Sequence, residues 1–144
     1  MTDNARWVTS RIGRSGFHTN ISSGGHHLIA DEPVPVGGTD RGLTPYELLL
    51  SALGACTAMT LRIYADRKGW DLESATVQLR SARSHEKDCE ECVDHKVGIG
   101  VIERRLGFEG SLTEEQRQRL TEIADRCPVK QTLERGLIIQ PATS

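Results

Sequence analysis

The sequence predicts an α+β fold with elements in the order βββ-α-ββ-α-β. Three observations lead to this prediction. Residues 44–68 carry apolar side chains nearly all round a helix, which indicates a long buried helix. Residues 6–30 contain three short alternating segments separated by glycine turns, which is typical of a β-meander. Two strand segments, an amphipathic helix and a last strand then complete the chain.

The length and composition favour one small domain that associates with a second copy. A chain of 144 residues is long enough for one domain with its own core, so we treat residues 1–144 as a single domain. The apolar fraction is 37% and aromatic residues make up only 4%, which is a modest core for a monomer.

Charge and hydropathy exclude several classes of partner. The net charge of −2 and the lack of a basic stripe argue against nucleic-acid binding. The sequence has no run of 18 uninterrupted apolar residues and no signal-peptide region, so we expect no membrane partner and a cytoplasmic location.

The first 43 residues predict a three-stranded meander followed by a loop. The strand segments cover residues 6–12, 17–21 and 26–30. Glycine-rich turns at residues 13–16 and 22–25 separate them. Residues 31–43 are rich in Pro and Gly, so we expect a loop without helix or strand.

The central helix has clear start and stop signals. Thr44 can cap it, and Pro45 fits the first helical position, where its missing N–H costs nothing. Gly69 is a typical C-terminal stop, so the helix should end at Lys68. Cys56 lies in the middle of this helix, where a cysteine is either an inert core residue or a shielded thiol with a chemical role.

The second half of the chain begins with two predicted strands. Apolar residues alternate over residues 75–80, which indicates a half-buried strand. Residues 83–96 are polar and read as a loop. Alternation returns at residue 97 and continues to about residue 108, which predicts the partner strand.

An amphipathic helix and a closing strand follow. Thr113 and Gln116 form a capping-box signal at the start of this helix. Pro128 disfavours helical geometry at the preceding residue, so the helix should end or kink at Cys127. We expect a further helical turn over residues 129–135 and a strand over residues 137–140.

Four cysteines in a reducing compartment are catalytic, metal-binding or buried. Two of them, Cys56 and Cys127, lie on core-facing helix surfaces. Both can be small core residues, which is a common role of free cysteine. Alternatively they form a peroxide-reducing pair, in which one thiolate becomes a sulfenic acid and the other thiol condenses with it to a disulfide.

Three motifs resemble the OsmC/Ohr family and occur in the same order over essentially the whole chain. They are the YELLLSALGAC segment at residues 46–56, the ADRCPV segment at residues 124–129 and the GRSG turn at residues 13–16. The resemblance implies two antiparallel sheets around a long buried helix, in an intertwined homodimer with active sites at the subunit interface. It also implies thiol-dependent reduction of organic hydroperoxides without metal or organic cofactor, and a lipoyl-type dithiol as the reductant.

The resemblance also implies roles for individual residues. Cys56 corresponds to the attacking thiol and Cys127 to the resolving thiol. The family places an arginine in the N-terminal strand and turn, where it stabilises the thiolate. Arg14 is the candidate and Arg11 the alternative, while an exposed turn charge is the other interpretation of Arg14.

This chain departs from the family beside the helix-start proline. The family has a glutamate directly after that proline, which holds the arginine. Here Tyr46 stands in that position and Glu47 follows it. Since one residue rotates a helical side chain by about 100°, Glu47 or Tyr46 orients Arg14, or the arginine is held in another way.

The second cysteine pair, Cys89 and Cys92, has two histidines near it. With His85 and His95 it forms an H-x3-C-x2-C-x2-H pattern, which offers four possible zinc ligands. A redox-active pair and a solvated hairpin loop are the other interpretations. The acidic neighbours, Asp88, Glu90 and Glu91, disfavour thiolates by like-charge repulsion, which argues against a primary nucleophile in this loop.

These observations lead to three functional hypotheses. The first is a cytosolic cysteine-based organic hydroperoxide reductase, a peroxidase in oxidative-stress defence. The second is a non-enzymatic redox-sensing or zinc-binding module that uses Cys89 and Cys92. The third is a dimer that binds a small molecule and in which Cys56 and Cys127 are only structural.

Overall fold

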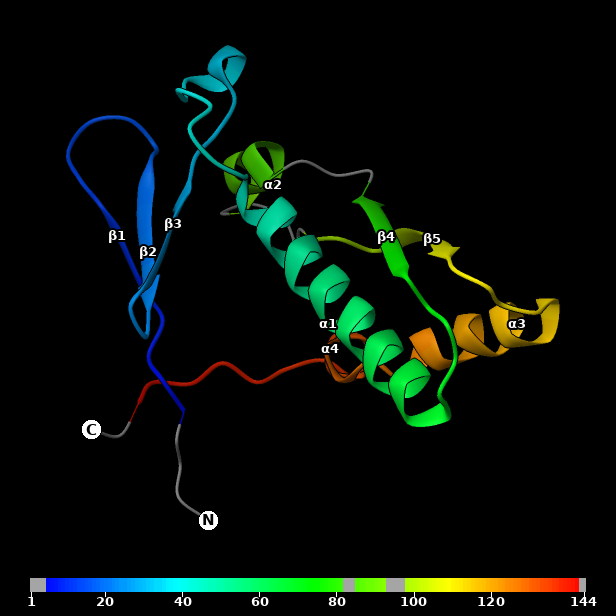
Figure 1. The fold of residues 1–144 in the computed structure, drawn as a ribbon. Coiled ribbons are helices and arrows are strands. Elements are labelled where there is room, and N and C mark those ends of the chain that lie inside the picture. Colours follow the sequence, from blue (N-terminus) through cyan, green and yellow to red (C-terminus); the bar gives the residue numbers. More distant parts are fainter. Residues whose placement is uncertain (1–4, 82–84, 93–97, 143–144) are drawn as a thin grey trace. The chain divides into compact units, whose positions relative to one another are not determined.

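The computed structural model describes residues 5–81, 85–92 and 98–142 of the chain (Figure 1). Within these residues the fold is α+β, as predicted, with two small antiparallel sheets and four α-helices. The elements are β1 (Thr9–Ile12), β2 (Thr19–Ser23), β3 (His26–Ala30), η1 (Val34–Val36), α1 (Pro45–Lys68), β4 (Ser74–Ser81), α2 (His85–Glu91), β5 (Ile102–Glu109), α3 (Glu114–Ile123), η2 (Ala124–Arg126) and α4 (Pro128–Arg135).

The chain forms two compact units. Unit 1 comprises Met1–Leu49 and Ser81–Val101, and unit 2 comprises Leu50–Arg80 and Ile102–Ser144. Helix α1 therefore begins in unit 1 and continues into unit 2.

Unit 1 contains the predicted meander. Strand β2 pairs antiparallel with both neighbours, and its Thr19 lies opposite Ile12 of β1 and Ala30 of β3. The following loop is not wholly irregular, since it contains the short 3₁₀-helix η1. The sequence prediction of a loop without any helix was wrong here, because two prolines in three residues favour a tight turn of this kind.

The carboxylate of Asp31 organises this loop. Asp31 is buried and accepts hydrogen bonds from the backbone N–H groups of Glu32, Thr39 and Arg41. It also accepts the Thr39 hydroxyl at 2.6 Å. A single side chain therefore satisfies donors from both ends of the loop.

Helix α1 has the predicted boundaries, and its caps explain them. Thr44 accepts the N–H of Glu47 at 3.3 Å, and the Glu47 carboxylate accepts the N–H of Thr44 at 2.9 Å, which is a reciprocal capping box. At the other end Gly69 adopts φ of 70°, a left-handed conformation that favours glycine. Pro45 is the first helical residue, as expected.

The two faces of α1 differ in burial. One face is buried through Leu53, Thr57, Leu61 and Ala65. Among the described residues, α1 is the one helix that is long and apolar enough to cross a membrane, with a mean hydropathy of 1.5 over 18 residues. Because its buried residues Leu61 and Ala65 belong to the core of unit 2, it is a core helix of this fold.

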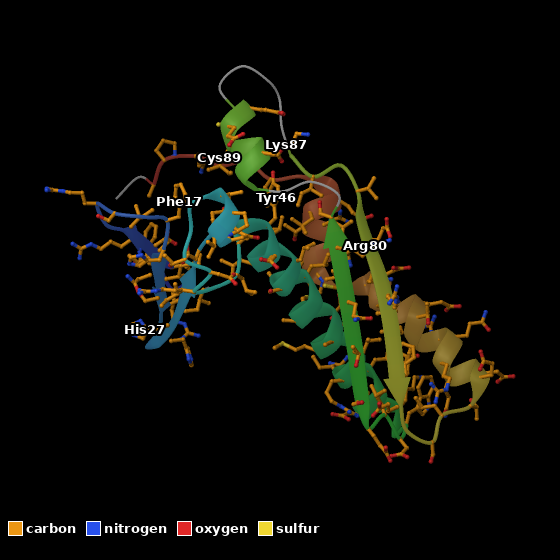
Figure 2. All side chains as sticks on the ribbon, turned by 90° about the horizontal axis from the view of Figure 1, so that it is seen from above. Phe17, His27, Tyr46, Arg80, Lys87 and Cys89 are labelled. Carbon is orange, nitrogen blue, oxygen red and sulfur yellow. The ribbon has the colours of Figure 1, made fainter. Side chains whose placement is uncertain are left out.

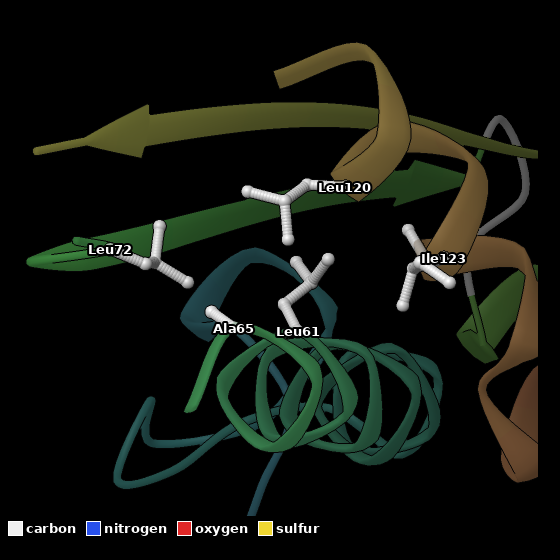
Figure 3. Packing of buried hydrophobic residues seen from close by; sticks show 6 residues of the cluster. Leu61, Ala65, Leu72, Leu120 and Ile123 are labelled. Carbon is white, nitrogen blue, oxygen red and sulfur yellow. The ribbon is translucent and has the colours of Figure 1, made fainter. Parts of the chain in front are cut away.

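The hydrophobic core lies in unit 2, between α1, α3 and the β4–β5 sheet (Figure 3). Its buried members are Leu61, Ala65, Leu72, Leu120, Ile123 and Ala124. Side chains of β4 and β5 alternate between half-buried and exposed positions, as the sequence predicts for half-buried strands. Full burial of a leucine stabilises a fold by about 1.5–3 kcal/mol, so this small cluster fixes the end of α1 against α3.

Helix α3 also agrees with the sequence at both ends. The Thr113 side chain accepts the N–H of Gln116, and the Gln116 side chain accepts the N–H of Thr113. The helix passes into η2 and ends at Cys127, with Pro128 beginning α4. The predicted end at Cys127 and the further helical turn after it are thus confirmed.

Three elements differ from the predicted order. Residues 85–91 form α2 instead of a polar loop, because their Glu and Lys residues are good helix formers. Strand β5 begins at Ile102 and not at residue 97. Residues 137–140 form no strand, and Ile138 and Ile139 are 90% and 96% exposed, because a strand requires a neighbour with which to pair.

Candidate thiol site

The fold brings Cys56 and Cys127 together within unit 2. Cys56 lies in the middle of α1, and Cys127 is the residue directly before α4. Their side chains interact with each other, and both are free thiols. Cys127 is completely buried, whereas Cys56 is half-buried.

The chain holds Cys127 in an extended conformation between two helical segments. Its φ and ψ are −54° and 124°, which is the geometry that a following proline favours. Its N–H donates to the Ala124 carbonyl at 3.4 Å, and its carbonyl accepts the N–H of Gln131 at 3.1 Å. Backbone hydrogen bonds therefore hold Cys127 both to the preceding helical segment and to α4.

Arg104 fastens the segment before Cys127 to β5. Its guanidinium donates to the Ala124 carbonyl at 3.3 Å and to the Asp125 carboxylate at 2.8 Å. Lys130 of α4 lies 3.9 Å from the same carboxylate. Strand β5 thus fixes the backbone turn that carries the buried thiol.

Close packing places Gly54 of α1 beside β4. A Cβ atom on Gly54 would lie 3.3 Å from a Leu79 methyl carbon, so glycine allows α1 to approach the strand closely. One turn further along, the hydroxyl of the fully buried Thr57 donates to the Leu53 carbonyl at 2.8 Å. The same hydroxyl also interacts with Cys127.

The two thiols have opposite pKa shifts. Burial raises the pKa of Cys56, and the interaction with Cys127 raises it further. Burial also pushes the pKa of Cys127 upward, but the Cys56 thiol and the donors around it outweigh burial and lower that pKa overall. In the reduced pair the proton is therefore held more firmly on Cys56.

The donors around Cys127 come from two helices. The backbone N–H groups of Lys130 and Val129 favour its thiolate, and so does the Thr57 hydroxyl. The sulfur does not complete a helix-capping hydrogen bond of good geometry to α4. The N–H groups nevertheless lie near enough to the sulfur to lower its pKa, as the positive end of a helix does.

Arg14 and Arg11 lie in unit 1. Arg14 is exposed in the turn between β1 and β2, and Arg11 is exposed within β1. Both cysteines of the pair lie in unit 2. The approach of either arginine to Cys56 stays a prediction.

Tyr46 and Glu47 are each engaged within unit 1. The Glu47 carboxylate serves the capping box of α1. The Tyr46 hydroxyl donates a short hydrogen bond to the carboxylate of Asp88, which is buried on α2. Figure 2 shows Tyr46 at the start of α1 beside α2, the helix that carries Cys89. The role of these side chains in orienting Arg14 also stays a prediction.

Helix α2 exposes Cys89, and Cys92 is exposed directly after it. The Cys92 thiol donates to the Cys89 carbonyl at 3.0 Å. The other two candidate zinc ligands are not described, since His95 lies outside the described residues and the structure describes only the backbone of His85. Within the described part, no three His, Cys, Asp or Glu side chains are grouped to hold a metal ion.

Three residues of functional interest were not predicted from the sequence. Thr57 follows Cys56 directly. The signal that could have found it is a polar residue at a core-facing position of the helix. Arg104 and Asp88 gave no such signal, because their partners lie 20 to 42 residues away in the chain.

A hollow of about 290 Å³ lies on the β4–β5 sheet. Its lining contains neither Cys56 nor Cys127. It is lined by Gln78, Leu79, Arg80, Glu103, Arg104 and Arg105. This hollow is therefore separate from the thiol pair.

The α+β fold brings two free cysteine thiols together in unit 2. The OsmC family, described as OsmC-like protein, matches residues 38–141 in a comparison with family models. The chain belongs to the OsmC-like family. A search of curated proteins found no match.

Solved structures show the same fold at low identity. An OsmC-like protein from Mycoplasma pneumoniae is 20% identical, with a TM-score of 0.73 over 92% of this chain and 89% of that one. An organic hydroperoxide resistance protein OsmC from Legionella pneumophila is 16% identical, with a TM-score of 0.63 over 91% and 90%. An organic hydroperoxide resistance protein from Elizabethkingia anophelis is 20% identical, with a TM-score of 0.61 over 90% and 88%.

These findings confirm the predicted family and fold.

Proposed function

We propose that this protein is a cytosolic thiol-dependent peroxidase that reduces organic hydroperoxides. The observation that carries the proposal is the direct interaction of the Cys56 and Cys127 side chains. Two thiols in contact can store and pass on the two electrons that peroxide reduction requires.

The proposed reaction has two oxidative steps. The Cys56 thiolate attacks one oxygen of the hydroperoxide, the O–O bond breaks, and the alkoxide takes a proton to leave as an alcohol. Cys56 is then a sulfenic acid. The Cys127 sulfur attacks the Cys56 sulfur, water leaves and a disulfide forms. A dithiol of the lipoyl type reduces this disulfide and becomes a disulfide itself.

The pKa shifts define what Cys56 requires as the nucleophile. Its pKa is raised by burial and by Cys127 within its own chain, so an attacking thiolate requires a nearby cation. We assign this cation to Arg14, with Arg11 as the alternative. Tyr46 or Glu47 orients the guanidinium in this proposal, since both lie at the start of the helix that carries Cys56.

The proposal includes a homodimer with sites at the subunit interface. Exposed apolar residues support it, because a free apolar surface favours association. Met59 and Ile63 of α1 are 64% and 52% exposed, and they lie on a different face from buried Leu61. The family resemblance points in the same direction.

The test is consumption of an organic hydroperoxide with a dithiol as electron donor. We expect turnover by the wild type, complete loss in Cys56→Ser and loss of disulfide formation in Cys127→Ser. Cys89→Ser is the matched control and should retain turnover, because its exposed thiol lies on α2 and takes no part in the pair. Equal activity of Cys56→Ser and wild type would refute the proposal.

A second candidate function rests on Cys89 and Cys92, which are exposed and joined by the hydrogen bond from the Cys92 thiol. In this alternative the protein is a redox-sensing or zinc-binding module without turnover. Elemental analysis showing one zinc per chain, together with no hydroperoxide consumption, would favour it.

Native-state alkylation that labels neither Cys56 nor Cys127 would instead indicate a dimer with structural cysteines.

A further inference from the structure

The two sulfurs of the pair differ in access from solvent. Cys127 is 0% exposed, and Thr57 beside it is also 0% exposed. Cys56 is half-buried, so its side chain reaches the surface of unit 2. A thiol that reduces a disulfide approaches in line with the S–S bond, so it attacks one sulfur and expels the other. Access alone therefore favours attack on Cys56 with Cys127 as the leaving group.

The surroundings of Cys127 suit a leaving thiolate. Thr57 of α1 and the N–H groups of Val129 and Lys130 at the start of α4 surround its sulfur. The same groups lower the pKa of Cys127, and a thiol of lower pKa leaves faster in disulfide exchange. Cys56 has the opposite shift. Leaving-group chemistry and access thus favour the same direction of cleavage.

Thr57 has a specific part in this arrangement. A hydroxyl carries one proton, so it makes one donated hydrogen bond at a time. In the structure that proton is directed to the Leu53 carbonyl at 2.8 Å. The hydroxyl also interacts with Cys127, so rotation about its Cβ–Oγ bond turns the proton towards the sulfur as negative charge develops.

We propose that the external dithiol attacks the Cys56 sulfur of the oxidised pair, and that Cys127 leaves as a thiolate stabilised by Thr57 and the first turn of α4. This inference rests on the proposed peroxidase function and adds the direction of its reductive step.

Atoms and electrons balance in the following way. One thiolate of the dithiol bonds to the Cys56 sulfur, and the electron pair of the Cys56–Cys127 bond moves to the Cys127 sulfur. The second thiol of the reductant loses its proton and attacks the reductant sulfur in the mixed disulfide. Cys56 is released as a thiolate, and the dithiol becomes a disulfide.

The first test locates the mixed disulfide. The wild-type protein is oxidised with one equivalent of an organic hydroperoxide, and peptide mass mapping verifies the Cys56–Cys127 disulfide. One equivalent of cysteamine is added, because this monothiol has no second thiol with which to resolve the mixed disulfide within the same molecule, and the sample is quenched early with acid and mapped. We expect cysteamine on Cys56 and a free thiol at Cys127.

Cysteamine on Cys127 would overturn the inference and leave the proposed function intact. If no disulfide forms after peroxide treatment, the proposed function itself fails. The two failures are therefore distinguishable in the same experiment.

The second test examines Thr57 by single-turnover reduction of the oxidised protein with excess dithiol. We expect the disulfide of Thr57→Val to be reduced at least tenfold more slowly than that of wild type. Thr57→Ser should recover most of the reduction rate, because it restores the hydroxyl. The matched control is Thr132→Val on α4, which loses the same kind of hydrogen bond, from Thr132 to the Pro128 carbonyl at 2.8 Å.

The dithiol should reduce oxidised Thr132→Val at the wild-type rate, since the exposed Thr132 hydroxyl donates to the Pro128 carbonyl and not to the thiol pair. An unchanged rate in Thr57→Val would exclude the hydroxyl from the leaving step. Equal slowing in Thr57→Val and Thr57→Ser would do the same, because it would indicate a packing effect. Circular dichroism on every variant verifies that the helices are intact.

Discussion

At the scale of single residues, the surroundings of a side chain decide its chemistry. Cys56 and Cys127 carry the same group and touch each other, yet the pKa of one is raised and that of the other lowered. Both are penalised by burial, but their mutual interaction raises the pKa of Cys56 and lowers that of Cys127, and the Lys130 N–H and the Thr57 hydroxyl lower the pKa of Cys127 further. The nucleophilic role proposed for Cys56 therefore depends on a cation supplied from elsewhere, which makes Arg14 the most informative single substitution after the cysteines.

Asp31 gives a prediction at the same scale. The Thr39 hydroxyl, together with the N–H groups around the carboxylate, lowers the pKa of Asp31 from 3.8 to about 2. A lowered folded-state pKa contributes stability that is present above the unfolded pKa and is lost as pH falls through the folded value. We expect Asp31→Asn to melt at a lower temperature than wild type at pH 7, with a difference that shrinks between pH 4 and pH 2.

The control for this prediction is Asp40→Asn in the same loop. Asp40 is exposed and adopts φ of 54°, a conformation that asparagine accepts well. Thermal unfolding followed by circular dichroism across this pH range measures both variants. A constant difference between Asp31→Asn and wild type down to pH 2 would contradict the assigned role.

At the scale of elements, the hydrogen bond from Tyr46 to Asp88 joins the first turn of α1 to α2. Tyr46→Phe removes the donor to a buried carboxylate, and a hydrogen bond to a charged group contributes about 1.5–3 kcal/mol. We expect amide exchange of α2 to become roughly tenfold faster or more, since exchange reports local opening. Hydrogen exchange with mass spectrometry measures this directly.

Tyr64→Phe is the matched control for α2. Its hydroxyl accepts a hydrogen bond from Arg119 at 3.1 Å within unit 2, so its loss should leave exchange in α2 unchanged. If α2 exchanges at the same rate in Tyr46→Phe and wild type, the hydrogen bond does not hold this helix.

The elements that the sequence predicts well carry their own boundary signals. Helix α1 has Thr44, Pro45 and Gly69 within one residue of its ends, and α3 has a capping box. The thiol pair was also proposed as one alternative from the helix positions of the two cysteines, and the family resemblance then implied their roles. Helix α2 was missed although its Glu and Lys residues favour a helix. Its contact with α1, from Asp88 to Tyr46, joins residues 42 positions apart, and no local pattern encodes that contact.

At the scale of the whole molecule, one chain leaves much apolar surface uncovered. Leu137, Ile138 and Ile139 have strand-forming composition but form no strand within the chain. The predicted strand was therefore wrong, because a strand forms only when another edge is present to accept its hydrogen bonds. The exposed face of α1 is apolar as well, which is consistent with a second copy covering both surfaces.

Met59 tests the proposed dimer. It is 64% exposed on α1, so its replacement by lysine should not disturb the core around Leu61. If a second copy covers this face, Met59→Lys places an unpaired charge in an apolar interface, which costs several kcal/mol. We expect the dimer dissociation constant to rise roughly 100-fold, measured by analytical ultracentrifugation over a concentration series. Gln118→Lys, which adds the same charge at an exposed position of α3, is the control and should sediment as wild type. A dimer of unchanged affinity in Met59→Lys would show that this face of α1 does not form the interface.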